Sequence, residues 1–119
     1  MKTDGDHYEE ASAQWLVRKG LRILERNYRC RTGEIDLIAF DGNTLIFVEV
    51  RARTNRWFAS AAASIDRRKQ RRLARVAAHY LQHHPGSPPS CRFDAVVWEP
   101  DADSGKLRAR WIRNAFSLD

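Results

Sequence analysis

Two acidic residues interrupt apolar segments, and they are the places where catalysis or metal binding could arise. Asp36 lies in the run IDLI (residues 35–38) and Glu49 in the run IFVEV (residues 46–50). A carboxylate in a buried strand loses hydration and needs a partner. Both runs belong to one expected hairpin, so the carboxylates can be neighbours that share Mg²⁺ or Mn²⁺, cations that prefer oxygen ligands. The alternative, a buried ion pair with Arg51 or Arg53, stays open on spacing alone.

Arg51 follows Glu49 at a spacing of two residues, which places both side chains on one face of a strand. A metal together with a fixed cation is what phosphoryl transfer needs, since one holds phosphate and water and the other offsets developing charge. The same spacing also suits a plain ion pair on the sheet.

The second expected helix carries most of the remaining candidates. Lys69 lies four residues from both Ile65 and Leu73 on the apolar stripe, so its amine either stays in solvent or reaches the carboxylates, and Gln70 beside it could orient a water or phosphate. The basic residues on another face of this helix suit either phosphate contacts or simple solvation. They are Arg68, Arg71, Arg72 and Arg75.

Two further motifs have weaker claims. Asp94 lies in a strand beside Arg92, and we interpret it as structural, ion-paired with a neighbouring Arg. Trp57 and Phe58 follow the third strand and could stack on a base, although aromatic residues more often pack in the core or a loop.

The pattern of apolar residues indicates the elements that must hold these side chains. Helical periodicity alternates with strand-like alternation in the order αβββαβ(β), which is typical of an α/β domain whose mixed sheet is flanked by helices. The first three strands should form an antiparallel meander. Helices are expected over residues 7–19 and 65–83, and strands over residues 21–30, 34–40, 44–52, 91–98 and 106–113.

Composition narrows the class of protein. The chain of 119 residues fits one domain, residues 1–119, and its net charge of +6 favours a polyanionic partner, nucleic acid first. Arginine supplies 17 of the 21 basic residues, and guanidinium groups bind phosphate bidentately. No membrane-spanning run or leader is visible, and the two cysteines lack a metal-binding spacing, so we expect a cytoplasmic protein with reduced thiols.

Several runs together resemble one bacterial family. They are residues 33–39 (GEIDLIA), 47–53 (FVEVRAR), 69–70 (KQ), 91–94 (CRFD) and 114–116 (NAF). From about residue 8 to residue 116 the chain resembles the YraN family, which is similar to the PD-(D/E)XK nucleases. The resemblance implies a restriction-endonuclease-like core, close to that of archaeal Holliday-junction resolvases.

The resemblance also implies roles for individual residues. Glu9, preferred over Glu10, matches the acid of the first helix, Asp36 the strand aspartate, and Glu49 the first residue of the E-x-K motif. Asp36 and Glu49 would bind Mg²⁺ or Mn²⁺. Arg51 departs from the motif lysine, and because arginine stays protonated it can stabilise charge but not act as a base.

Three function classes follow from these observations. The first is a Mg-dependent nuclease that hydrolyses phosphodiester bonds, with branched DNA as a candidate substrate and Lys69 or Arg51 stabilising the phosphate. The second is a nucleic-acid-binding module that keeps the fold and lacks cleavage. The third is an adaptor whose basic face meets an acidic protein. DNA is favoured over RNA, and a homodimer would suit the twofold symmetry of a junction.

Overall fold

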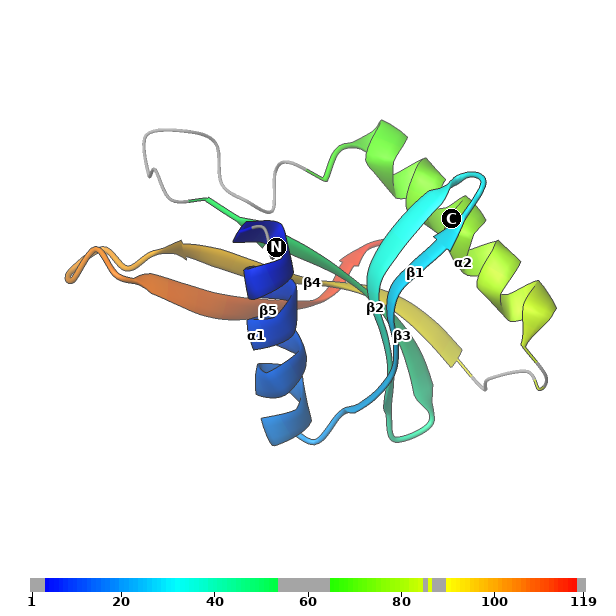
Figure 1. Ribbon diagram of the computed structural model, residues 1–119, viewed down its shortest axis with the longest axis horizontal. Coiled ribbons are helices and arrows are strands. Elements are labelled where there is room, and N and C mark those ends of the chain that lie inside the picture. Colours follow the sequence, from blue (N-terminus) through cyan, green and yellow to red (C-terminus); the bar gives the residue numbers. More distant parts are fainter. Residues whose placement is uncertain (1–3, 54–64, 85, 87–89, 118–119) are drawn as a thin grey trace.

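The computed structural model describes residues 4–53, 65–84, 86 and 90–117, with side chains from residue 7 onward. A five-stranded sheet in the order β1-β2-β3-β4-β5 forms the centre of the molecule, and the two helices lie apart with the sheet between them (Figure 1). The elements are α1 (Asp4–Arg18), β1 (Arg22–Cys30), β2 (Gly33–Asp41), β3 (Thr44–Ala52), α2 (Arg67–His83), β4 (Ser90–Pro100) and β5 (Leu107–Phe116).

The sheet is mixed. β1, β2 and β3 form the predicted antiparallel meander, β4 joins β3 in parallel after α2, and β5 returns antiparallel to β4. The parallel step needs a long connection, which α2 supplies. The mixed α/β class and the order of elements are therefore confirmed, with shifts of one to three residues at most boundaries.

Each face of the sheet has its own apolar core. In β3, Phe47 packs toward α2 with Leu73 and Val76, whereas Ile46 packs toward α1 with Leu16. This alternation follows from the period of two in a strand. The predicted stripe of α2 is buried throughout, and it comprises Ile65, Leu73, Val76, Ala77 and Tyr80.

The alternation of side chains along β2 is interrupted. Strict alternation predicts Ile35, Leu37 and Ala39 on one face, and this prediction is wrong for Ile35: it belongs to the core on the α2 side, whereas the other two belong to the core on the α1 side. Pairing between β2 and β3 ends at Leu37 and Val48. Residues of β2 before Leu37 do not pair with β3, so the side chain of Ile35 need not follow the alternation of the paired part.

The helix ends are fixed by local hydrogen bonds. Gly20 adopts φ 102°, and the amides of Gly20 and Leu21 donate to the carbonyls of Val17 and Leu16 at 3.0 and 3.1 Å. These bonds make the Schellman motif that ends α1. Asp66 caps α2 by accepting from the Lys69 amide at 2.9 Å. Neither helix, within the described chain, is long and apolar enough to cross a membrane.

Candidate functional site

Asp36 and Glu49 meet where the sheet opens. The β2–β3 register ends with Leu37 opposite Val48, and Asp36 and Glu49 are the next residues on the two strands. Beyond the last pair, the Val50 amide donates to Asp36 Oδ2 at 2.8 Å, so a side chain satisfies this backbone donor. The two carboxylates are therefore neighbours, as expected for residues of one hairpin, and the charge of Asp36 acts on Glu49.

Glu49 is a buried carboxyl group between unlike neighbours. Its side chain is 4% exposed, and Oε2 lies 3.0 Å from Arg51 Nη2 and 3.2 Å from Lys69 Nζ. Burial first, then the charge of Asp36 and a hydrogen bond with it, raise the pKa of Glu49 to about 8, although Arg51 and Lys69 oppose the shift. The Asp36–Glu49 pair therefore holds a proton near neutral pH.

Two polar atoms of this site remain without a hydrogen-bond donor or acceptor among the described residues. They are Glu49 Oε1 and Arg51 Nε, and both are buried. Unpaired buried polar atoms are uncommon because each one costs desolvation energy. Within the described part of the chain, the site therefore has one acceptor and one donor left unused.

Two further carboxylates join Asp36. Glu9 of α1, Glu34 and Asp36 are half-buried and place one oxygen each within 4.8 Å of one another. With the Asn27 amide oriented to donate, its nitrogen lies 2.7 Å from Glu9 Oε2 and 2.8 Å from Glu34 Oε1. Arg29 lies 3.4 Å from Glu34. Glu34 was not among the predicted site residues, although its spacing of two from Asp36 could have pointed to it.

The structure also separates the two acids of α1. Glu10 pairs with Arg26 of β1 and accepts from Gln14 Nε2 at 3.1 Å. Glu9 lies with Glu34 and Asp36 instead. Of the two neighbouring acids Glu9 and Glu10, Glu9 is therefore the one that lies beside Asp36. Glu9 is also the residue that the resemblance matched to the acid of the first helix.

These residues fit a divalent cation. We call Glu9, Glu34, Asp36 and Glu49 the carboxylate cluster; its oxygens are the hard ligands that Mg²⁺ and Mn²⁺ prefer. The sequence predicted Asp36 and Glu49 as the ligands. The geometric group consists of Asp36 with Glu9 and Glu34, so Asp36 is common to both sets.

Lys69 and Gln70 have different surroundings. Lys69 spans from α2 to Glu49, the reach that its place on the apolar stripe allowed. The Gln70 side chain donates to the Ile65 carbonyl at 3.0 Å and supports the entry to α2. The role expected for Gln70, orienting a water or phosphate, stays a prediction.

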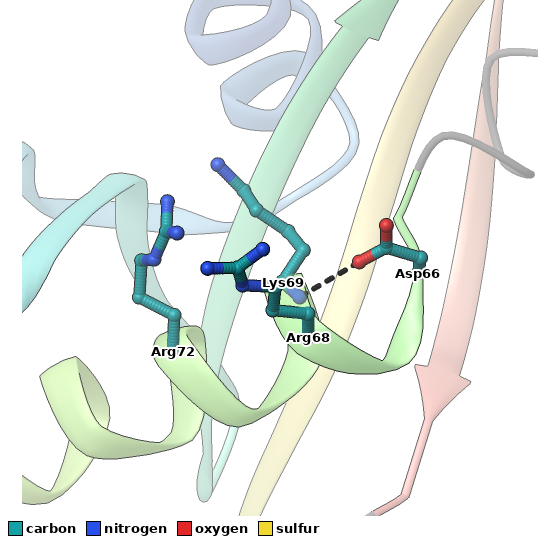
Figure 2. A pocket seen from close by; sticks show the side chains of 4 residues that line it. All are labelled: Asp66, Arg68, Lys69 and Arg72. Carbon is teal, nitrogen blue, oxygen red and sulfur yellow. Dashed lines mark hydrogen bonds between the residues drawn. The ribbon is translucent and has the colours of Figure 1, made fainter.

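A basic pocket lies beside the carboxylate cluster at the start of α2. It is lined by Asp66, Arg68, Lys69 and Arg72, has a volume of about 340 Å³, and Figure 2 shows the three basic side chains extending from one side of the helix. The other two predicted phosphate-binding residues, Arg71 and Arg75, are exposed on α2 and do not line this pocket.

Two remaining expectations have simple outcomes. Asp94 forms the predicted structural ion pair, with Arg92 Nε at 2.8 Å from its Oδ1. Trp57 and Phe58 lie outside the described residues.

Comparison with known proteins identifies the family of the chain. Residues 8–97 match the model of "Uncharacterised protein family UPF0102". The chain belongs to the UPF0102 family. A UPF0102 protein of Symbiobacterium thermophilum is 50% identical over 112 residues, which cover 94% of each chain. Another UPF0102 protein, of Alcanivorax borkumensis, is 47% identical over 116 residues, covering 97% of this chain and 92% of the relative.

The family assignment agrees with the resemblance to YraN proteins. The matched range of the UPF0102 model includes every residue of the carboxylate cluster and of the basic pocket, and it excludes β5.

Proposed function

We propose that this UPF0102 protein is a metal-dependent nuclease with a restriction-endonuclease-like core that hydrolyses phosphodiester bonds. The observation that carries the proposal is the meeting of Asp36 and Glu49 where β2 and β3 part, with Lys69 Nζ 3.2 Å from Glu49. Acidic oxygens and a fixed ammonium side by side suit a reaction at a phosphate.

Asp36 is the central ligand in this proposal, with Glu9 and Glu34 on one side and Glu49 on the other. When bound, Mg²⁺ or Mn²⁺ offsets the phosphate charge and makes water a better nucleophile near neutral pH. The protein contributes the fixed positions of its oxygens, because β2, β3 and α1 are all packed in the apolar cores.

Lys69 takes the place of the motif lysine in this proposal. The third strand carries Arg51 at that position, but Lys69 reaches the same oxygen, Glu49 Oε2, from α2. Both cations face the negative charge that develops on a phosphate during hydrolysis. Arg51 stays protonated, so it orients and stabilises, whereas the lysine amine can also exchange a proton.

The shared proton of Asp36 and Glu49 couples cation binding to pH. Because the pKa of Glu49 is raised to about 8, a cation that binds the ionised pair must displace this proton. Binding therefore tightens as pH rises toward about 8. Cleavage should follow the same direction.

Nucleic acid is the partner that the charge favours. The net charge is +6, and five exposed arginines lie along α2. We propose DNA as the substrate, ahead of RNA, and branched DNA as the preferred form. The enzyme would act in the cytoplasm as a homodimer, whose twofold symmetry matches that of a junction.

A binding module without cleavage is the second candidate. The arginine at position 51 and the engagement of Glu49 by two cations favour it, since a carboxylate held in ion pairs is a weaker cation ligand. Both candidates bind nucleic acid, so cleavage separates them.

The test is cleavage of a panel of linear, flapped and four-way DNA and RNA with Mg²⁺ or Mn²⁺. We expect products that EDTA abolishes and that Asp36→Ala and Glu49→Ala lose without losing binding, because the basic residues are unchanged. Arg51→Lys, which restores E-x-K, should cleave at least as fast as wild type.

Two results would count against the nuclease. Binding of the panel without cleavage, even by Arg51→Lys, would favour the binding module. Cleavage that persists in Asp36→Ala would indicate a contaminating enzyme and leave the assigned residues unsupported.

A further inference from the structure

We infer that the basic pocket holds one backbone phosphate of a nucleic-acid strand, next to the phosphate that lies at the carboxylate cluster. This inference rests on the proposed function and adds to it where the strand lies. It also divides the basic face of α2 into two unequal parts.

The pocket has the chemistry of an anion site. Among the described residues, its lining contains three cations and one acid, and the acid, Asp66, already accepts a hydrogen bond from the Lys69 backbone amide at 2.9 Å through Oδ1. The first turn of the 17-residue helix contains no acidic residue, and a helix start favours negative charge. Two guanidinium groups and an ammonium match the oxygens of a single phosphate.

Gly33 holds Arg72 in position. A Cβ on Gly33 would lie 3.1 Å from Arg72 Cδ and 3.3 Å from Cγ, so the missing side chain lets the arginine stem lie against the β1–β2 turn. The stem packs on Gly33 and Arg72 lines the pocket. Packing of the stem restricts the positions that the guanidinium can take, which lowers the entropy lost when it binds a phosphate.

Lys69 links the pocket with the carboxylate cluster. It lines the pocket, and its Nζ lies 3.2 Å from Glu49 Oε2. A phosphate in the pocket is thus within one lysine side chain of the proposed cleavage site. Neighbouring phosphates of one strand can occupy the two positions, which makes the pocket a positioning device for the strand.

The experiment compares two pairs of substitutions on the same helix. Arg68→Gln with Arg72→Gln removes the pocket guanidiniums, and Arg71→Gln with Arg75→Gln removes the same charge outside it. Glutamine keeps much of each stem, and thermal unfolding checks the fold of both variants. Binding of a fluorescent DNA duplex is measured by anisotropy in EDTA at several salt concentrations, with a 5′-phosphate or a 5′-hydroxyl.

We expect the pocket pair to lose about tenfold in affinity and to lower the salt slope of log K by about 0.9, the effect of one phosphate contact. The outer pair should lose less than half as much, and both duplex ends should give the same result. Equal losses from the two pairs would overturn the inference. A larger loss from the pocket pair that is seen only with the 5′-phosphate duplex would also overturn it, in favour of a site for a terminal phosphate.

This readout is independent of cleavage. If the pocket pair loses more affinity than the outer pair in a protein that cleaves nothing, the pocket is supported and the nuclease proposal fails. If the protein cleaves but both pairs lose the same affinity, only the pocket inference fails. Wild-type protein that binds no duplex would defeat both.

Discussion

The sheet contains two buried carboxylates with opposite surroundings. Asp94 is fully buried and accepts four hydrogen bonds, two from Arg92 at 2.8 and 2.9 Å, one from Trp111 Nε1 at 2.8 Å and one from the Asn114 amide at 2.9 Å. Glu49 is 4% exposed, lies against the like charge of Asp36, and keeps Oε1 without a partner among the described residues.

The contrast separates a carboxylate whose two oxygens are both hydrogen-bonded from one that keeps an oxygen unpaired among the described residues. Donors surround Asp94 on β4 and β5, and each of its two oxygens accepts two hydrogen bonds. Glu49 is only partly compensated, and perturbed carboxyl groups of this kind cluster at functional sites. Burial alone therefore does not identify a site; incomplete pairing does.

The largest expected effect is on stability at Asp94. Asp94→Ala leaves Arg92 and the Trp111 indole without their acceptor, and we expect the free energy of unfolding to fall by about 3–5 kcal/mol. Glu49→Gln should leave it unchanged or raise it near pH 7, because wild type must take up a proton at Glu49 when it folds and the amide need not. Urea unfolding of both variants measures the difference, and equal losses would remove the distinction between the two sites.

The pH dependence of stability should come next in size. The pKa of Glu49 is raised from 4.5 to about 8, so between these pH values the folded protein binds more protons than the unfolded chain. Stability from this group is therefore complete below about pH 4.5 and is lost as pH rises through about 8, by on the order of 2–4 kcal/mol. Glu49→Gln removes the ionisation.

Urea unfolding in EDTA across this pH range measures the effect, with Glu99→Gln as a control on an exposed ion pair. The free energy of unfolding of wild type should fall relative to that of Glu49→Gln between about pH 4.5 and 8. Parallel pH curves for these two proteins would contradict the raised pKa.

A smaller effect should distinguish the cations beside the two carboxylates. Lys69 is 28% exposed and Arg92 is 23% exposed, so they form a matched pair. Lys69→Met should lower the cleavage rate about a hundredfold, roughly 2.7 kcal/mol, with little loss of stability. Arg92→Met should lower stability and leave the cleavage rate of the folded fraction near that of wild type. A loss of stability in Lys69→Met and a loss of cleavage in Arg92→Met would contradict the different roles given to these two cations.

Periodicity was enough to predict the order of elements and the facing of α2, because these depend on local residue patterns. Strand alternation also predicted that Asp36 and Glu49 would be neighbours, because the two strands of a hairpin lie side by side; in the structure both residues lie directly beyond the last paired residues, Leu37 and Val48. The place of Asn27 beside Glu9 and Glu34 depends on a left-handed backbone at φ 53°. Such a local conformation leaves no periodic signal in the sequence.

The pocket was harder to predict for a similar reason. The sequence groups Arg68, Arg71, Arg72 and Arg75 as one basic face. Only Arg68 and Arg72 of these four line the pocket, and Arg72 packs on Gly33, a contact between residues that lie far apart in the chain. Tertiary contacts of this kind cannot be read from helical spacing.

Calorimetric titration of Mn²⁺ into the folded protein tests the central claim most directly. Repeating it near pH 7 in two buffers of different ionisation enthalpy also counts the protons released. We expect wild type to bind Mn²⁺ with proton release, Asp36→Asn to give no binding heat, and Asp103→Asn, a change in the exposed β4–β5 turn, to behave as wild type. No heat from folded wild type at millimolar Mn²⁺, or equal heats from wild type and Asp36→Asn, would contradict a divalent-cation site at the carboxylate cluster.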